Sequence, residues 1–420
     1  MNVALNTTPE QDFSRQTPLD ADRDTLLREL RLKIELLVDG ISFDPDDLKH
    51  FSIGVENAKQ IHLLFDMNKQ HHAGVDLPFG YYLPHGLFVA FRWDPQSRFR
   101  LAAEDGKPVL YRGKNRIGEI EFYKRPYLLD RVTSDGESFS HIAVFTPEGG
   151  INVCFSNECD LKNTGEDCKF CNINSTADAY RQDNIFIKSA RQVGEVYAAA
   201  YKEKLGNHIN LTGGFISERR EVDYYLDVAD EIKNRAGVDT IHGTAVIGAP
   251  LDLKVIEHYK EAGYETIAMN LEIWDKDIYK AICPGKQARC GGWEHWVKAL
   301  ETCGEIFGHG NVRSNIVAGI EPKESILEGV EHLASKGVIC LANAWCPNPG
   351  SALESHRTPE PSWHYDLTLK VATIYRRYGF TTAKIYGASA ATSPFHDAFR
   401  ILSGENTADR LPQYKHPVLG

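Results

Sequence analysis

The stretch Ile151-Asn-Val-Cys154-Phe-Ser-Asn-Glu-Cys159-Asp-Leu-Lys-Asn-Thr-Gly-Glu-Asp-Cys168-Lys-Phe170-Cys171 carries the strongest signal in this sequence. It begins as a short apolar strand and continues into a polar loop that holds four of the chain's nine cysteines. Thiols spaced this closely, in a sequence that shows no export signal, indicate a metal or an iron–sulfur cluster rather than a disulfide framework.

Downstream of this stretch, strand-like and helix-like segments alternate. The predicted strands cover residues 151–155, 208–211, 240–247, 266–273, 312–318 and 338–344. The predicted helices cover residues 189–205, 220–236, 253–262, 293–307, 323–336 and 361–378. Such alternation builds a parallel sheet with right-handed crossovers. The sequence therefore predicts an α/β fold, a partial (β/α)6 TIM-like barrel that is open on one side, with its site at the carboxyl ends of the strands.

Upstream of the barrel, the pattern of the sequence differs. Apolar residues at helical spacing between 22 and 38 predict one amphipathic helix, and short strand-like runs separated by turn residues follow it. We therefore predict four parts: a flexible tail over 1–20, an N-terminal α+β domain over 21–140, the barrel over 141–380 and a C-terminal extension over 381–420.

Composition excludes several classes of protein. Of the 420 residues, 42% are hydrophobic and 25% are charged, which is typical of a globular chain and excludes wholesale disorder. Asp and Glu outnumber Lys and Arg by 58 to 47, and no basic block occurs, so we expect no nucleic-acid partner. No apolar run reaches the roughly 18 residues of a membrane span. We therefore expect no membrane association and a cytoplasmic location.

Two kinds of metal site are compatible with the cysteine spacing. Cys154, Cys159, Cys168 and Cys171 together could hold a structural zinc ion in a non-radical barrel protein. However, eight residues separate the two pairs, whereas paired zinc knuckles usually have roughly 12–20 between them. Three cysteines on a [4Fe–4S] cluster would leave one iron free for a small molecule, which suits a catalytic site.

The segment Cys168-Lys-Phe170-Cys171 resembles the end of the radical S-adenosylmethionine (SAM) motif, which is usually C-x3-C-x-aromatic-C. The resemblance implies that three thiolates bind a [4Fe–4S] cluster whose fourth iron is chelated by SAM. This sequence departs from the motif, because the gap before Cys168 is eight residues from Cys159 and thirteen from Cys154. We favour Cys159 as the first ligand, which gives C-x8-C-x2-C, because a shorter loop closes at a lower entropic cost.

Further segments at successive strand ends resemble biotin- and lipoyl-synthase-like barrels of this superfamily. The resemblance implies SAM-binding roles for residues at the ends of the second, fourth and fifth strands and in the loop after the fourth, namely Phe170 beside the cluster, Gly213, Gly214, Asn270, Glu272, Arg289, Ser314 and Asn315. Each has a plain alternative: a Gly-Gly turn, a carboxylate facing solvent or a solvated loop charge.

Two of these assignments leave a choice open. Lys286 and Arg289 are equally suited to neutralise the SAM carboxylate. Ser314 and Asn315 are consecutive in a strand, so only one of them can point into the barrel. Four other cysteines near strand ends, Cys154, Cys283, Cys290 and Cys346, have no assigned role.

The resemblance implies an enzyme that reductively cleaves SAM and transfers the radical to a small-molecule substrate in a biosynthetic pathway. It also implies an electron donor such as flavodoxin or ferredoxin. An alternative is cleavage of another S–C bond, with transfer of the 3-amino-3-carboxypropyl group of SAM to a nucleophile such as arsenite, as in arsinothricin biosynthesis.

Overall fold

The computed structural model describes residues 21–44, 51, 78–124, 126–147, 149–173, 177–178, 181, 187–206, 208–387 and 393–404. Outside these residues lie the tail predicted over 1–20 and residues 405–420 of the predicted C-terminal extension.

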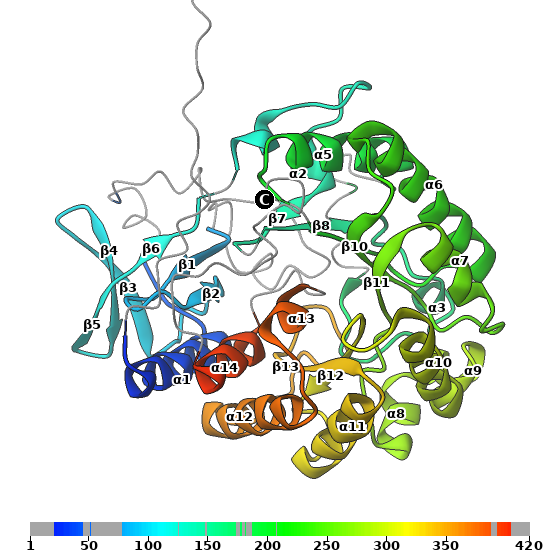
Figure 1. Cartoon of the computed structure of the whole chain (residues 1–420). Coiled ribbons are helices and arrows are strands. Elements are labelled where there is room, and N and C mark those ends of the chain that lie inside the picture. Colours follow the sequence, from blue (N-terminus) through cyan, green and yellow to red (C-terminus); the bar gives the residue numbers. More distant parts are fainter. Residues whose placement is uncertain are drawn as a thin grey trace, which may run out of the picture.

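A curled seven-stranded sheet forms the centre of the molecule (Figure 1). Its strand order is β13-β12-β11-β10-β9-β8-β7, and all neighbours are parallel except β7 and β8. The strands are β7 (Val144–Phe145), β8 (Gly150–Cys154), β9 (His208–Thr212), β10 (Ile241–Val246), β11 (Tyr264–Ala268), β12 (Val312–Ala318) and β13 (Val338–Ala344). Because β13 does not pair with β7, the sheet is a half-barrel. The predicted partial barrel is thus confirmed, with an antiparallel edge strand that the sequence analysis did not assign to it.

Helices cover the outer face of this sheet (Figure 1). They are α5 (Ala190–Lys202), α6 (Glu218–Ala236), α7 (Val255–Glu261), α10 (Gly292–Phe307), α11 (Lys323–Ser335) and α12 (Pro361–Arg377). Shorter helices lie in the loops: α2 (Phe139–Ile142), α3 (Asp160–Asn163), α8 (Lys276–Ile282) and α9 (Pro284–Arg289), with a 3-10 turn η3 (Tyr127–Asp130). Alternate strand residues such as Ile209 and Leu211 are fully buried beneath the outer helices.

The inner face of the half-barrel is unusually polar. Asn152, Asn210, Thr244 and Thr266 stand opposite one another on β8, β9, β10 and β11. Asn152 and Asn210 are only half-buried, and the Asn210 Nδ2 donates to Asn152 Oδ1 at 3.3 Å. These side chains therefore form a row of polar groups across the inner face of β8 to β11.

Two small antiparallel sheets and one helix precede the barrel. The helix is α1 (Arg23–Asp39), and the strands are β1 (Gly80–Tyr82), β2 (Phe88–Ala90), β3 (Phe99–Glu104), β4 (Lys107–Arg112), β5 (Asn115–Glu119) and β6 (Glu121–Phe122). The α+β character of this part agrees with the prediction. Helix α1, however, packs on α12 and α14 of the C-terminal half. The Lys33 Nζ reaches the Asp397 carboxylate at 2.6 Å, and the Lys33 side chain is 1% exposed.

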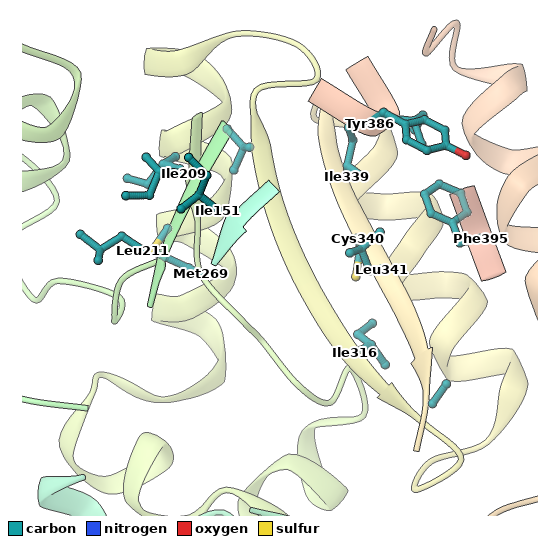
Figure 2. Close-up of a cluster of buried hydrophobic side chains, with 14 of the residues drawn as sticks. Ile151, Ile209, Leu211, Met269, Ile316, Ile339, Cys340, Leu341, Tyr386 and Phe395 are labelled. Carbon is teal, nitrogen blue, oxygen red and sulfur yellow. The ribbon is translucent and has the colours of Figure 1, made fainter. Parts of the chain in front are cut away.

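The C-terminal extension closes one side of the half-barrel. Helix α14 (Pro394–Ser403) packs beside β13, and helix α13 (Thr382–Gly387) packs on α14. Figure 2 shows Tyr386 beside Ile339, with Phe395 close to Leu341. Along the outer edge of β13, the Tyr375 hydroxyl forms hydrogen bonds with backbone groups of residues 338 and 340. No helix in the described part of the chain has the length and apolarity needed to cross a membrane.

Candidate functional site

The cysteine loop leaves the carboxyl end of β8 and is held by backbone hydrogen bonds. Cys159 stands immediately before α3, whose first N–H donates to the Phe215 carbonyl at 2.8 Å. Further along, the Cys171 N–H donates to the Cys168 carbonyl at 3.0 Å, which closes a tight turn around Phe170. The three thiols proposed as ligands are all half-buried, so they border accessible space.

The junction of α8 and α9 holds the other side of this turn. The Lys169 N–H donates to the Ile282 carbonyl, and the Gly285 N–H donates to the Glu166 carbonyl, each at 2.9 Å. A Cβ at Gly285 would lie 2.4 Å from that Glu166 oxygen, so only glycine permits this approach. The junction thereby brings Cys283, which is fully buried, against Cys168.

The two thiols in contact have opposite pKa shifts. A hydrogen bond from the Cys283 thiol lowers the pKa of Cys168 despite burial, and the Lys286 ammonium lowers it further. Burial and the same hydrogen bond raise the pKa of Cys283 well above its ordinary value. Burial also raises the pKa of Cys171, with smaller contributions from Cys168 and Cys159. Cys168 is therefore the thiol most ready to act as a thiolate, and Cys283 is its donor.

Cys154 lies apart from the other three thiols of the motif. It is buried, and its Sγ donates to the Ser156 carbonyl at 3.3 Å and approaches Asn157 Oδ1 at 3.4 Å. Burial raises the pKa of Cys154 to about 11. These contacts weaken the alternative of a four-cysteine zinc site, which would need this thiol as a ligand.

The chemistry of the remaining donor set fits a cluster better than a single ion. Within the described residues, no three His, Cys, Asp or Glu side chains converge closely enough to hold one metal ion. In an iron–sulfur cluster each thiolate binds a different iron, so the sulfur atoms of the ligands stay further apart. Cys159 and Cys168 are nevertheless near enough to Cys171 to contribute to the raised pKa of its thiol.

Gly213 and Gly214 follow β9 and lie against the cysteine loop. The Gly214 N–H donates to the Ser156 carbonyl at 2.9 Å. A Cβ at Gly214 would lie 1.9 Å from the Glu158 carbonyl oxygen, and one at Gly213 would lie 2.6 Å from the Phe155 ring. The glycine pair therefore has a packing role of its own, because it lets the backbone before Cys159 lie directly on the end of β9.

Asn270 and Asn315 belong to a chain of amides across the inner face. The Asn315 Nδ2 donates to Asn270 Oδ1 at 3.0 Å, and the Asn343 Nδ2 donates to Asn315 Oδ1 at 3.2 Å. The Ser393 hydroxyl, just before α14, donates to Asn343 Oδ1 at 3.0 Å. The structure thus brings together two predicted SAM contacts, one from the segment after β11 and one from β12.

Ser314 lies on the opposite face of β12 from Asn315. It is fully buried, and its Oγ accepts a hydrogen bond from the Leu271 N–H at 3.1 Å. Opposite it on β13 stands Cys340, another fully buried residue. Of these two consecutive residues, Asn315 therefore faces the inner side of the half-barrel, and the side chain of Ser314 does not.

Glu272 forms an ion pair with Lys286 at 2.9 Å, and both side chains are nearly buried. The Lys286 Nζ also donates to the Asn270 carbonyl at 2.8 Å and lies over the Trp296 ring, 4.5 Å from its centroid. Burial alone would lower the pKa of Lys286, but the carboxylate and the nearby thiols Cys168 and Cys283 raise it above its ordinary value. A fixed cation therefore stands between Glu272 and the cysteine turn.

The backbone of Glu272 has a φ of 74°, in the left-handed region that non-glycine residues rarely adopt. Two hydrogen bonds of 2.8 Å to β12 hold it there, one donated to the Asn315 carbonyl and one accepted from the Val317 N–H. Strain of this kind is typical of functional sites. Strand β11 itself ends at Ala268, five residues before the predicted end of the strand.

Arg289 takes a different position from Lys286. Its side chain is 41% exposed and lies 3.5 Å from the Glu166 carboxylate, and its Nη1 donates to Thr164 Oγ1 at 2.9 Å. These contacts attach α9 to the outside of the cysteine loop. Of the two cations considered from the sequence, Lys286 is therefore the one inside the site.

Phe170 is buried under the segment that follows β13. Its carbonyl accepts a hydrogen bond from the Asn348 Nδ2 at 3.1 Å, and the neighbouring Lys169 carbonyl accepts one from the Leu353 N–H at 3.2 Å. Cys283 could not be assigned a role from the sequence, because no local pattern pairs it with Cys168, which lies 115 residues earlier in the chain.

The fold and the site together define a half-barrel α/β protein with a thiol-rich loop at the carboxyl ends of its strands. Residues 153–338 match the model of the Radical SAM superfamily. The matched segment runs from β8, through the cysteine loop, to the first residue of β13.

Two curated relatives match part of the chain. Bacteriochlorophyllide c C-7(1)-hydroxylase of Chlorobaculum limnaeum is 30% identical over 242 residues, covering 54% of this chain and 60% of that protein. The 5-amino-6-(D-ribitylamino)uracil–L-tyrosine 4-hydroxyphenyl transferase of Methanopyrus kandleri is 27% identical over 181 residues, covering 38% and 44%. The chain thus spans between 44% and 60% of the length of these relatives.

Two solved structures align with part of the chain. Methylornithine synthase (PylB) superposes with a TM-score of 0.41 at 16% identity, covering 60% of this chain and 72% of that one. The FeFe-hydrogenase maturase HydG from Carboxydothermus hydrogenoformans gives 0.41 at 15% identity, covering 62% and 58%.

Proposed function

We propose that this protein is a radical SAM enzyme that holds a [4Fe–4S] cluster on Cys159, Cys168 and Cys171 and acts on a small molecule inside the half-barrel. Bound there, the cluster and SAM would supply reductive cleavage of a sulfonium S–C bond and hence a carbon-centred radical. The observation that carries the proposal is the turn from Cys168 to Cys171, held beside Cys159 and Lys286 at the strand ends of a radical SAM domain.

The side chains around the turn have separable roles in this proposal. Lys286 balances the negative charge of the thiolates, since an ammonium beside a thiolate favours its charged form. Asn270, Asn315 and the ion-paired Glu272 present polar atoms to SAM in the manner of biotin- and lipoyl-synthase-like barrels. Arg289 holds the loop before Cys168 instead of the SAM carboxylate, a role that its contacts with Thr164 and Glu166 support.

The half-buried amides of the inner face support a polar small-molecule substrate in a biosynthetic reaction. The two curated relatives are named a hydroxylase and a transferase, so their names do not favour one reaction. An external one-electron donor such as flavodoxin or ferredoxin completes the proposal. All nine cysteines are unpaired thiols, which supports a reducing compartment such as the cytoplasm.

Anaerobic purification with iron and sulfide analysis tests the ligand set. The wild-type protein should be brown and hold about four irons and four sulfides per chain. Cys159→Ala, Cys168→Ala and Cys171→Ala should each lose the cluster, while Cys154→Ala and the core control Cys303→Ala should retain it. A colourless protein with one zinc per chain would refute the proposal. Loss in Cys154→Ala with retention in Cys159→Ala would instead reassign the first ligand.

Incubation with SAM and dithionite, followed by mass spectrometry, identifies which S–C bond is broken. 5′-Deoxyadenosine as the product supports radical transfer by hydrogen abstraction. Methylthioadenosine supports transfer of the 3-amino-3-carboxypropyl group. If a protein that holds a complete cluster yields neither of these two products, that result contradicts SAM cleavage.

A further inference from the structure

Arg313 is a buried cation on the inner face of the half-barrel. It is the second residue of β12, where it stands opposite Ala268 on β11 and Ile339 on β13. It precedes Asn315 by two residues, so it shares the face of the amide chain and lies one layer nearer the amino ends of the strands. Only 5% of Arg313 is exposed.

The guanidinium of Arg313 has fewer partners than its burial requires. Its Nη2 donates to the carbonyl of Ile385 in α13. Its Nε and Nη1 have no hydrogen-bond partner among the residues that the structure describes, and no carboxylate in that part of the chain forms an ion pair with it. A buried charge without a partner is costly, and so are its unsatisfied donors.

The groups around Arg313 on the inner face are neutral. His208, the first residue of β9, lies close enough to be influenced by the charge of Arg313, although two strands separate β9 from β12. Burial, together with His242 and Arg313, lowers the pKa of His208 to about 3, so its imidazole is neutral at pH 7.

The proton of His208 can be assigned from its neighbours. Thr266 Oγ1 donates to the Gly243 carbonyl at 2.8 Å and must accept from Thr244, whose Oγ1 lies 2.6 Å away. Thr244 therefore accepts from His208 Nε2, which is 2.8 Å distant. The hydroxyls of Thr244 and Thr266 are thus hydrogen-bonded to neutral groups, and they offer no negative charge to Arg313.

We propose that Arg313 binds an anionic group of the substrate, a carboxylate or a phosphate, at the floor of the half-barrel. The identification of this ligand as the substrate rests on the function proposed above. Above Arg313, the half-buried amides of Asn210, Asn315 and Asn343 provide donors and acceptors for uncharged polar groups. The substrate class is accordingly a polar small molecule with an acidic group at the end that enters the barrel first.

Titration of the full chain with inorganic phosphate and with acetate tests this inference, with chloride at matched ionic strength as the reference. Binding is measured by calorimetry and by the shift in Tm, without SAM or reductant, so the result does not depend on SAM cleavage. Wild-type protein should bind at least one probe, and Arg313→Gln should weaken its Kd at least tenfold. Arg377→Gln, a change at an exposed arginine paired with Glu331, should bind like the wild type.

The Tm of the Arg313 variants shows whether misfolding could explain a loss of probe binding. Arg313→Gln should have a Tm equal to or above that of the wild type in chloride, because it removes an unpaired buried cation. Arg313→Lys keeps the charge and should retain part of the probe affinity. Equal probe binding by Arg313→Gln and the wild type would overturn the inference, as would no probe binding by the wild type. If the protein cleaves SAM but gives one of these two binding results, only the anion site is refuted. If the protein binds the anion through Arg313 but holds no cluster, the proposed function is refuted instead.

Discussion

Cys283 shows how a single residue can tune a cluster ligand without being one. Its thiol donates to Cys168 from a fully buried position. A hydrogen bond to a ligand sulfur stabilises the reduced, more electron-rich cluster and therefore raises its reduction potential. Since radical SAM chemistry starts from the reduced cluster, such a hydrogen-bond donor affects how easily the cluster is reduced.

We expect Cys283→Ala to lower the midpoint potential of the cluster, and Cys283→Ser to restore part of the difference because serine keeps a donor. Redox titration followed by electron paramagnetic resonance measures both variants. Cys303→Ala, a buried thiol on α10, is the matched control and should leave the potential unchanged. A wild-type potential in Cys283→Ala would show that this thiol only fills space.

At the scale of the element, hydrophobic periodicity was sufficient to predict all six parallel strands and the six outer helices. Apolar runs of strand length alternate with amphipathic segments of helix length, so the existence and order of these elements could be read from the chain. Parity alone could not decide between Ser314 and Asn315, because that choice depends on which face the helices cover. Helices α8 and α9 were missed because they are seven and six residues long and meet at Cys283-Pro284-Gly285, a sequence typical of a loop.

The turn after Glu272 depends on one carboxylate. Glu321, just after β12, accepts hydrogen bonds from the Trp274 N–H at 2.8 Å and the Asp275 N–H at 2.7 Å. Burial raises the pKa of Glu321 to about 7. The folded protein therefore binds more protons than the unfolded chain between the ordinary pKa of 4.5 and about 7. The contribution of Glu321 to the free energy of unfolding is fully present below this window and falls as pH rises through it.

We expect the stability of the wild type relative to Glu321→Gln to decrease between pH 5 and pH 7, since glutamine does not titrate. Urea denaturation of both proteins across this range measures the difference. The exposed Glu324 on α11 supplies the matched control for a glutamate-to-glutamine change outside this turn. A pH-independent difference between the wild type and Glu321→Gln would contradict the raised pKa of Glu321.

At the scale of the whole molecule, the first and last described helices hold each other. Lys33 of α1 and Asp397 of α14 form an ion pair in which the side chains are 1% and 11% exposed. The Arg400 guanidinium lies 3.6 Å from the same carboxylate. The N-terminal α+β part and the C-terminal extension are thus joined to one another as well as to the barrel.

Removing one partner of this pair should be more harmful than removing both. Lys33→Met leaves Asp397 with Arg400 alone in a buried position, and we expect a loss of about 3 kcal/mol in the free energy of unfolding. The double variant Lys33→Met/Asp397→Asn should recover much of that loss, as measured by urea denaturation. A double variant no more stable than Lys33→Met would show that packing, and not the buried charge, sets the cost.

The same ion pair has a consequence for how the protein is made. Its two residues are 364 positions apart, so a ribosome working at about 5–20 residues per second needs roughly 20–70 s to deliver Asp397 after Lys33. During that time every strand of the half-barrel and all three proposed cluster thiols have already emerged. Helix α1 lacks the partner of its Lys33 ammonium during that time, and its contact with α14 forms only after Asp397 has been made.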